Sequence, residues 1–150
     1  ATSGKLFAAG QAGERFAVRN SGATSVVEGC GSNGCEYMTG GNIAILGNTG
    51  DNFGAGMTGG MAFVYDENGD FDKRVNPETV IWQKIETDYW KNFLKNLIRK
   101  HFKETNSKVS EKIYNNFGTE IDKFYQICPK EMLDKLENPI SLKKIHGYAS

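Results

Sequence analysis

The sequence shows no excess of charge of either sign, because 18 Lys and Arg residues balance 18 Asp and Glu residues in a chain of 150. A surface for nucleic acid or for an anionic membrane normally carries a basic excess, so this balance argues against both kinds of partner. The sequence also contains no apolar run of about 18 residues and no signal-peptide pattern. We therefore expect a cytoplasmic protein.

Cysteine and histidine are scarce and scattered. The three cysteines, Cys30, Cys35 and Cys128, are an odd number, which fits a reducing compartment better than a disulfide framework. Cys30 and Cys35 are spaced CxxxxC, whereas a structural zinc site usually takes four ligands and an iron–sulfur cluster three or four. The two histidines, His101 and His146, are far from both in sequence. We predict small buried cysteines and no metal site.

Glycine and proline divide the chain near Asn76. Sixteen of the 18 glycines precede this residue, and all three prolines follow it. Such a shift in composition is typical of a change in architecture. We predict glycine-rich coils over residues 1–76 and a helical cap or brace with a tail over residues 77–150.

What the sequence does contain is a repeat of 19 residues over positions 22–69. It is marked by two glycine series: Gly22, Gly41, Gly60 and Gly31, Gly50, Gly69. Short runs rich in Val, Ile, Phe and Tyr follow the first series and predict strands. One further step back places Phe7 under Val26, so the pattern begins near the first residue.

The period sets the kind of fold that we expect. A 19-residue unit is too short for an ordinary helix plus strands, but it can hold two or three short strands with tight bends. The pattern therefore predicts a mainly β protein, a parallel β-helix whose coils stack at roughly 4.8 Å. Glycine suits the corners because it has no Cβ and accepts positive φ. Ala1-Thr2-Ser3 enters the repeat partway through a unit, so we expect a piece of a longer polypeptide.

After Thr87 the apolar period changes from 2 to 3.6. A stripe from Trp90 to Phe102 predicts a helix of about 17 residues that Thr87 or Asp88 can cap. His101 falls on this stripe, where we expect a packing residue with a hydrogen bond.

Further elements are predicted beyond that helix. A second helix is capped by Asn106 or Ser107 and ended by Gly118. A weaker third helix passes through Met132 and Leu136 before a loose tail. Residues 79–82 fit one more strand or the entry to the helices, and residues 124–128 form a short apolar piece.

Several motifs point to chemistry, but each has a plainer explanation. The fingerprint GxGxxG occurs at 29–34 and 54–59, yet a strand-like run follows each match where a dinucleotide site needs a helix. The acidic turn at 66–70 resembles a calcium loop, but its glycine comes too early. Four scattered acids do not stack as a carboxylate pair: Glu14, Glu28, Glu36 and Asp51. We predict no catalytic, cofactor-binding or metal-binding residue in this chain.

Three runs carry a family resemblance, namely residues 12–29, 34–41 and 52–66. They are similar to the C-terminal domain of the large subunit of glutamate synthase. The likeness continues thinly into the second half through five positions: His101, Thr105, Ser107, Phe124 and Pro129.

The resemblance implies a right-handed parallel β-helix, known as the GXGXG domain, at the end of a multidomain oxidoreductase of glutamate biosynthesis and ammonia assimilation. That family converts glutamine, 2-oxoglutarate and reducing equivalents into two glutamates. Its FMN and 3Fe-4S cluster lie upstream, with NADPH, NADH or ferredoxin as donor. The implied role is a rigid spacer between the amidotransferase and FMN-binding domains, with a small reductase subunit as a further partner.

Three other interpretations remain open from the sequence. A related β-helix in formylmethanofuran dehydrogenase has the same glycine pattern. A left-handed β-helix acyltransferase would need 18-residue coils and a histidine within them. A free-standing β-helix binding module would use one coil face.

Overall fold

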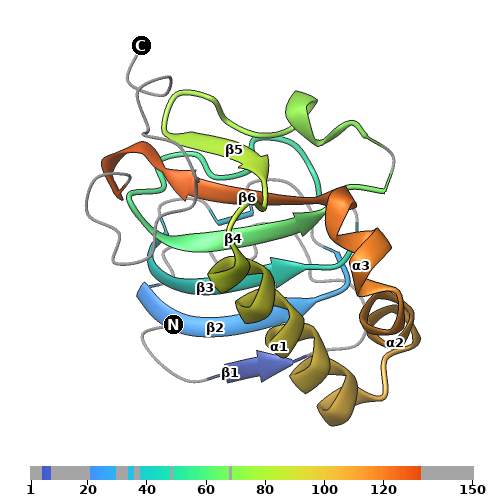
Figure 1. Cartoon of the computed structure of the whole chain (residues 1–150). Coiled ribbons are helices and arrows are strands. Elements are labelled where there is room, and N and C mark those ends of the chain that lie inside the picture. The colour runs from blue at the N-terminus through green and yellow to red at the C-terminus, as the bar shows by residue number, and fades with distance from the viewer. Residues whose placement is uncertain are drawn as a thin grey trace.

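The structure, a computed structural model, describes residues 5–7, 21–29, 34–35, 38–47, 49–67 and 69–132. Within them six strands form one sheet in the order β1-β2-β3-β4-β6-β5 (Figure 1). The strands are β1 (Lys5–Phe7), β2 (Ser21–Val27), β3 (Thr39–Ile45), β4 (Gly59–Tyr65), β5 (Val80–Lys84) and β6 (Phe124–Pro129). Strands β1 to β4 run parallel, and β6 runs antiparallel to both β4 and β5.

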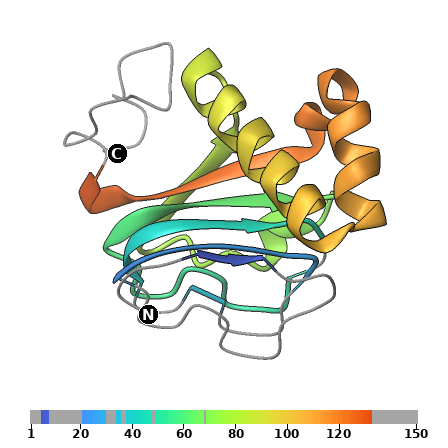
Figure 2. The same ribbon diagram turned by 90° about the horizontal axis from the view of Figure 1, so that it is seen from below.

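Helices cover one face of this sheet. They are α1 (Asp88–Thr105), α2 (Lys108–Asn115) and α3 (Phe117–Glu120), with short 3-10 turns at Phe71–Lys73, Ile121–Lys123 and Lys130–Met132. Seen edge-on, the sheet lies between the helices and a layer of loops (Figure 2). No helix in the described part of the chain is both long and apolar enough to cross a membrane.

The predicted right-handed parallel β-helix is wrong. The structure is a mixed α/β fold with a single open sheet, because each repeat contributes one strand to the sheet and the described residues between strands form turns and loops. Beyond β4 the sheet continues with the antiparallel strands β6 and β5, which a parallel solenoid does not contain. Strands from both predicted segments, 1–76 and 77–150, share this sheet, and the division between the segments stays a prediction.

The 19-residue repeat nevertheless sets much of the strand register. Phe7 pairs with Val26 as predicted, and Ala44 pairs with Phe63, also 19 residues on. Between β2 and β3 the step is shorter by one, since Val26 pairs with Ala44. The register shifts inside both pairs, near the glycines that open each strand.

Alternation along the strands produces two apolar cores, one on each face of the sheet. The helix-side core contains Phe63, Trp90, Leu94 and Ile98 together with Phe124. The loop-side core is built around Met38, Ile45, Phe53, Phe71 and Ile127. Burial on both faces explains why the central strands are apolar throughout rather than alternating with polar residues.

The predicted helices are confirmed in part. Thr87 caps α1 by accepting a hydrogen bond from the Trp90 N–H, and Ser107 caps α2 in the same way. The second helix ends at Asn115, three residues before Gly118, and a separate turn of helix begins at Phe117. Residues 79–82 and 124–128 fall on β5 and β6. The third predicted helix lies outside the described residues after Met132, where a 3-10 turn ends.

Candidate functional site

The corner glycines Gly22, Gly41 and Gly60 lie in three neighbouring strands of the parallel half of the sheet. Gly41 and Gly60 have φ of 87° and 83°, in the region that disfavours residues with a Cβ. A Cβ on the adjacent Gly59 would lie 2.0 Å from the Thr39 carbonyl oxygen of the next strand. Glycine is therefore needed where the strands begin, because their backbones meet there.

The second glycine series is not brought together in the same way. Gly31 lies outside the described residues, and Gly50 lies in the loop after β3. Gly69 has a φ of 75° and belongs to the turn that follows β4, where a Cβ would meet open space. Backbone conformation, not close approach, requires glycine at this position.

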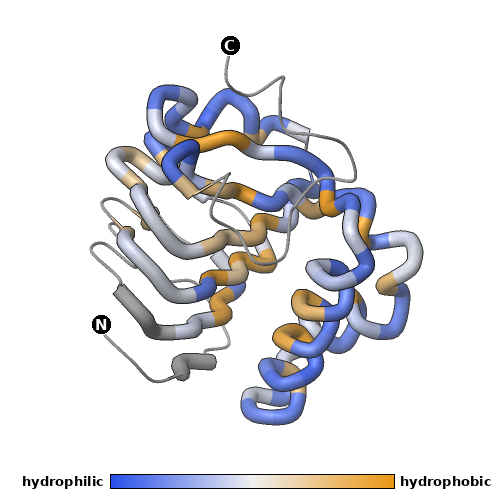
Figure 3. Tube along the Cα trace, turned by 60° about the vertical axis from the view of Figure 1, so that its left-hand side comes forward, coloured by the Kyte–Doolittle hydropathy of each residue, from blue (hydrophilic) through white to orange (hydrophobic). Residues whose placement is uncertain are grey.

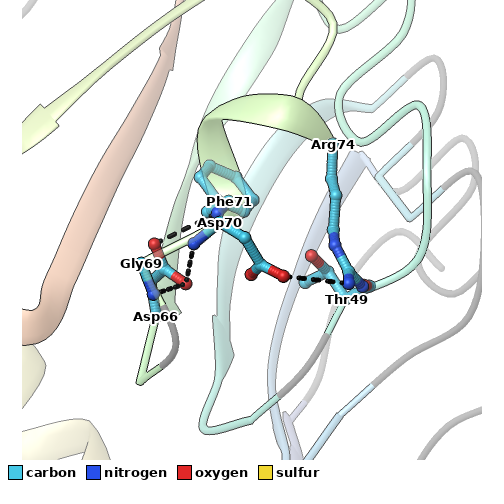
Figure 4. Close-up of polar contacts among 6 residues, drawn as sticks. All are labelled: Thr49, Asp66, Gly69, Asp70, Phe71 and Arg74. Carbon is cyan, nitrogen blue, oxygen red and sulfur yellow. Dashed lines mark hydrogen bonds and ion pairs between the residues drawn. The ribbon is translucent and has the colours of Figure 1, made fainter.

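The acidic turn after β4 is organised around the Asp66 carboxylate (Figure 4). Its Oδ1 accepts hydrogen bonds from the N–H groups of Gly69 and Asp70 at 3.1 and 3.2 Å, and its Oδ2 accepts one from Phe71 at 3.1 Å. Both oxygens thus bind the backbone of their own turn, which is a common use of aspartate in loops. The geometry explains the acidic pattern without a cation.

Arg74 fastens the end of this turn to the loop after β3. Its Nη1 donates to the Thr49 carbonyl, and its Nη2 lies 3.1 Å from the Asp70 carboxylate (Figure 4). These residues line a small hollow whose floor includes Tyr65 and Phe71. The guanidinium is already engaged by a carboxylate and a carbonyl, so the hollow offers little positive charge to a ligand.

Tyr65 and Glu120 form a buried polar link on the helix side of the sheet. The Tyr65 hydroxyl donates to Glu120 Oε2, and the same oxygen lies 3.3 Å from Lys123 Nζ. Tyr65 is 5% exposed and Glu120 is 7% exposed. The hydrogen bond from Tyr65 is the main cause that lowers the pKa of Glu120. Burial, followed by the nearby Glu120, raises the pKa of Tyr65.

His101 behaves as the predicted packing residue. It is fully buried on α1, and its Nδ1 shares a hydrogen bond with the hydroxyl of Ser110 on α2. The Thr105 hydroxyl donates to the His101 carbonyl at 2.8 Å, which ties the end of the helix. The imidazole therefore joins two helices, and no carboxylate is paired with it in these contacts.

The described cysteines occupy opposite faces of the sheet. Cys35 is buried in the loop-side core and Cys128 in the helix-side core, and both are free. Burial raises the pKa of the Cys128 thiol to about 12, so it is not a nucleophile at neutral pH. Cys30 lies outside the described residues. Among those that are described, no group of three or more His, Cys, Asp and Glu side chains is close enough to hold a metal ion.

The remaining sequence motifs are not brought into one site. The match at 54–59 leads directly into β4 and not into a helix, and part of the match at 29–34 lies outside the described residues. Of the four scattered acids, the structure describes Glu28, which is half-buried, and Asp51, which is exposed. That the chain holds no catalytic, cofactor or metal residue stays a prediction.

Sequence reasoning missed two buried polar features. The Tyr65–Glu120 link joins residues 55 apart, and no spacing in the sequence signals it. Gln126 on β6 is fully buried, and neither atom of its amide has a hydrogen-bond partner among the described residues. The one signal for Gln126 was its position inside the apolar run 124–128.

Glycines at the strand entries and polar side chains that fasten turns and helices define a glycine-repeat domain. The family model for the GXGXG motif matches residues 1–130, so the chain belongs to the GXGXG family.

The relatives make the family more specific. The chain is 61% identical to the glutamate synthase [NADPH] large chain of Azospirillum brasilense over 96% of its own length. It is 52% identical to the ferredoxin-dependent glutamate synthase of Pyropia yezoensis over 86% of its length, and 46% identical to the glutamate synthase [NADH] of Schizosaccharomyces pombe over 96%. The predicted resemblance is confirmed. The chain spans only 10%, 8% and 7% of these relatives, respectively.

Proposed function

We propose that this chain is the GXGXG domain of a glutamate synthase large chain. The observation that carries the proposal is 61% identity to such a large chain over 96% of the residues. In the proposed parent protein, glutamine and 2-oxoglutarate are converted with a reductant into two glutamates in the cytoplasm. This part of the polypeptide serves as a rigid spacer between the amidotransferase and FMN-binding domains and performs no chemistry itself.

The polar contacts support a structural role. Asp66 binds three N–H groups of its own turn, Arg74 joins that turn to a neighbouring loop, and Glu120 is held by Tyr65. These side chains are occupied in fastening the sheet to the layers on either side. A spacer needs this kind of stiffness, because a small displacement between reacting groups is costly in rate.

The FMN and 3Fe-4S cluster implied for the parent do not fit the described residues. A cluster needs three or four thiolates, and Cys35 and Cys128 lie in separate cores. The glycine-rich match at 54–59 opens a strand, so it offers no helix N-terminus to a phosphate. We therefore derive no step through either group and assign both to other parts of the parent.

The electron donor is also assigned elsewhere in the parent. The names of the three relatives specify NADPH, ferredoxin and NADH, although this chain is 46–61% identical to all three. A region that stays so similar across three donors is a poor candidate for choosing between them. Docking of a small reductase subunit or of ferredoxin therefore falls to other domains.

Coupled activity in the full-length protein tests the proposal. We expect the 150-residue chain to bind no FMN and to hydrolyse no glutamine. In the full-length protein, loosening the domain with Tyr65→Phe should raise the glutamine hydrolysed per glutamate formed, while Tyr89→Phe on the exposed face of α1 should not. Stoichiometric FMN binding by the 150-residue chain, or an unchanged ratio after Tyr65→Phe with proven loosening, would contradict the spacer role.

A further inference from the structure

Helix α1 carries a row of four bases at intervals of four residues, which we name the basic row: Lys91, Lys95, Arg99 and Lys103. The opposite side of the helix is fixed by buried apolar residues against the sheet. In Figure 3 the hydrophobic positions of the helix lie toward the sheet, and most of its outward side is hydrophilic. The row therefore lies along the part of α1 that points away from the core, with Lys95 and Lys103 exposed and the other two half-buried.

The row is surrounded by more positive charge than its own helices neutralise. Residues 88–115 contain seven Lys and Arg residues against three Asp and Glu residues, an excess of four. None of the four members forms an ion pair with a described residue. Lys95 lies 5.6 Å from the centre of the Tyr114 ring, a weak interaction that links α1 to α2.

Such a row works against the stability of the helix that carries it. Like charges four residues apart destabilise a helix by about 0.2–0.5 kcal/mol per pair, and the row contains three such pairs. A solvated helix face gains nothing from that arrangement, because alternating signs would give equal solubility and favourable pairs. Repulsion of this kind is relieved when an anionic surface lies against the row.

The acids of the chain are in a different part of the molecule. Residues 49–78 contain six Asp and Glu residues against Lys73 and Arg74. They belong to the loops and turns that build the loop-side core, whereas α1 covers the other face. Two of the acids, Asp66 and Asp70, are already held by backbone N–H groups or by Arg74. The row therefore calls for acids from outside this chain.

We propose that the basic row docks on an acidic protein surface in another domain of the same long polypeptide. This proposal rests on the proposed function, because the chain covers only 7–10% of the relatives and a parent of that length supplies neighbouring domains. Docking through α1 would hold the sheet in a fixed orientation to its neighbour. It would also be sensitive to salt, since the attraction between exposed charges is screened over about 10 Å at 0.1 M.

Lysine acetylation measured by mass spectrometry tests the proposal on two native proteins, the 150-residue chain and the full-length protein. We expect Lys91 and Lys103 to be acetylated several-fold more slowly in the full-length protein, and the difference to shrink at high salt. Lys73, exposed on the loop side, is the matched control and should react equally in both. Equal reactivity of the row in both proteins would overturn the proposal.

Charge reversal gives a second measurement with opposite signs in the two proteins. Lys103→Glu removes one repulsive pair, so it should leave the 150-residue chain as stable or raise its Tm, while it lowers the temperature of inactivation of the full-length protein. Lys73→Glu should not produce this opposition. A lowered Tm in both proteins, or in neither, would contradict docking within the polypeptide.

Other occupants would give distinct results. Protection that grows with the concentration of the 150-residue chain would indicate a second copy, and protection only after addition of a separate acidic protein would indicate a transient partner. Either result overturns docking within one polypeptide. A native protein that proves to be only 150 residues long by mass would refute the proposed function itself, before any labelling is done.

Discussion

The hydrogen bond between Tyr65 and Glu120 links the sheet to the helical layer, and Tyr65→Phe removes it with the loss of one oxygen. Glu120 is 7% exposed and would keep only Lys123, whose side chain is 43% exposed. A hydrogen bond to a charged group contributes about 1.5–3 kcal/mol, and a buried charge that loses a partner is costly. We expect the free energy of unfolding to fall by about 2 kcal/mol.

Urea unfolding at pH 7, followed by tryptophan fluorescence, measures this loss because Trp90 is buried in the helix-side core. Tyr89→Phe is the matched control. Tyr89 is 48% exposed, and its hydroxyl makes no hydrogen bond with a described residue. Its substitution should change the free energy of unfolding by less than about 0.5 kcal/mol.

The contribution of this link depends on pH in a defined direction. Because the pKa of Glu120 is lower in the folded than in the unfolded chain, the stabilisation is complete above the ordinary glutamate pKa of about 4.3 and is lost as the pH falls through the folded value. The difference between the native chain and Tyr65→Phe should therefore shrink in acid. A neutral hydrogen bond worth about 1 kcal/mol remains when Glu120 is protonated.

A double-mutant cycle with Glu120→Gln separates the link from the other effects of each substitution. We expect a coupling energy above about 1 kcal/mol at pH 7, because the two residues share one contact. If Tyr65→Phe costs no more than Tyr89→Phe, or if the two substitutions simply add, the link does not hold the layers together. That result would also remove the physical basis for loosening the spacer through Tyr65.

The remaining predictions concern residues with clear local surroundings. Gly59→Ala should cost more than about 3 kcal/mol in urea unfolding because its Cβ would clash with the Thr39 carbonyl, whereas Gly118→Ala, in open space on α3, should stabilise by up to about 1 kcal/mol. Gln126→Met should raise the unfolding free energy by about 1–2 kcal/mol because it removes an unsatisfied buried amide, and Gln126→Glu should lower it. Asp66→Ala should lower the Tm in calorimetry, with no effect of added calcium on either protein.

Local signals explain why the first helix was predictable. The stripe from Trp90 to Phe102 and the hydroxyl of Thr87 specify α1 through neighbours within a few turns, and the structure places the cap at that threonine. His101 was also predictable as a packing residue, since its position on the stripe directs it to the core. The identity of its partner, Ser110, depends on how two helices cross, which the stripe does not encode.

The sheet illustrates a limit of reasoning from periodicity. The repeat predicts which residues form parallel strands, but it carries no information on what lies beside the last one. The run 124–128 is compatible with a buried strand, and it inserts between β4 and β5 as β6 after more than 50 residues of intervening chain. A contact at such a separation is decided by the fit of two apolar surfaces, so the open mixed sheet could not be deduced from the 19-residue period.

The strand register shows how small a local feature can redirect the whole core. With a strict period of 19, Val26 would pair with Ile45, but the structure pairs it with Ala44. A shift of one residue moves a side chain to the other face of a sheet, so Val26 joins the helix-side core with Ala44 while Ile45 lies in the loop-side core. The glycines at the strand entries allow this shift, because a positive φ near Gly41 and Gly60 lets the chain bulge by one residue. The same glycines that reveal the repeat are thus the reason that its period does not fix every pair.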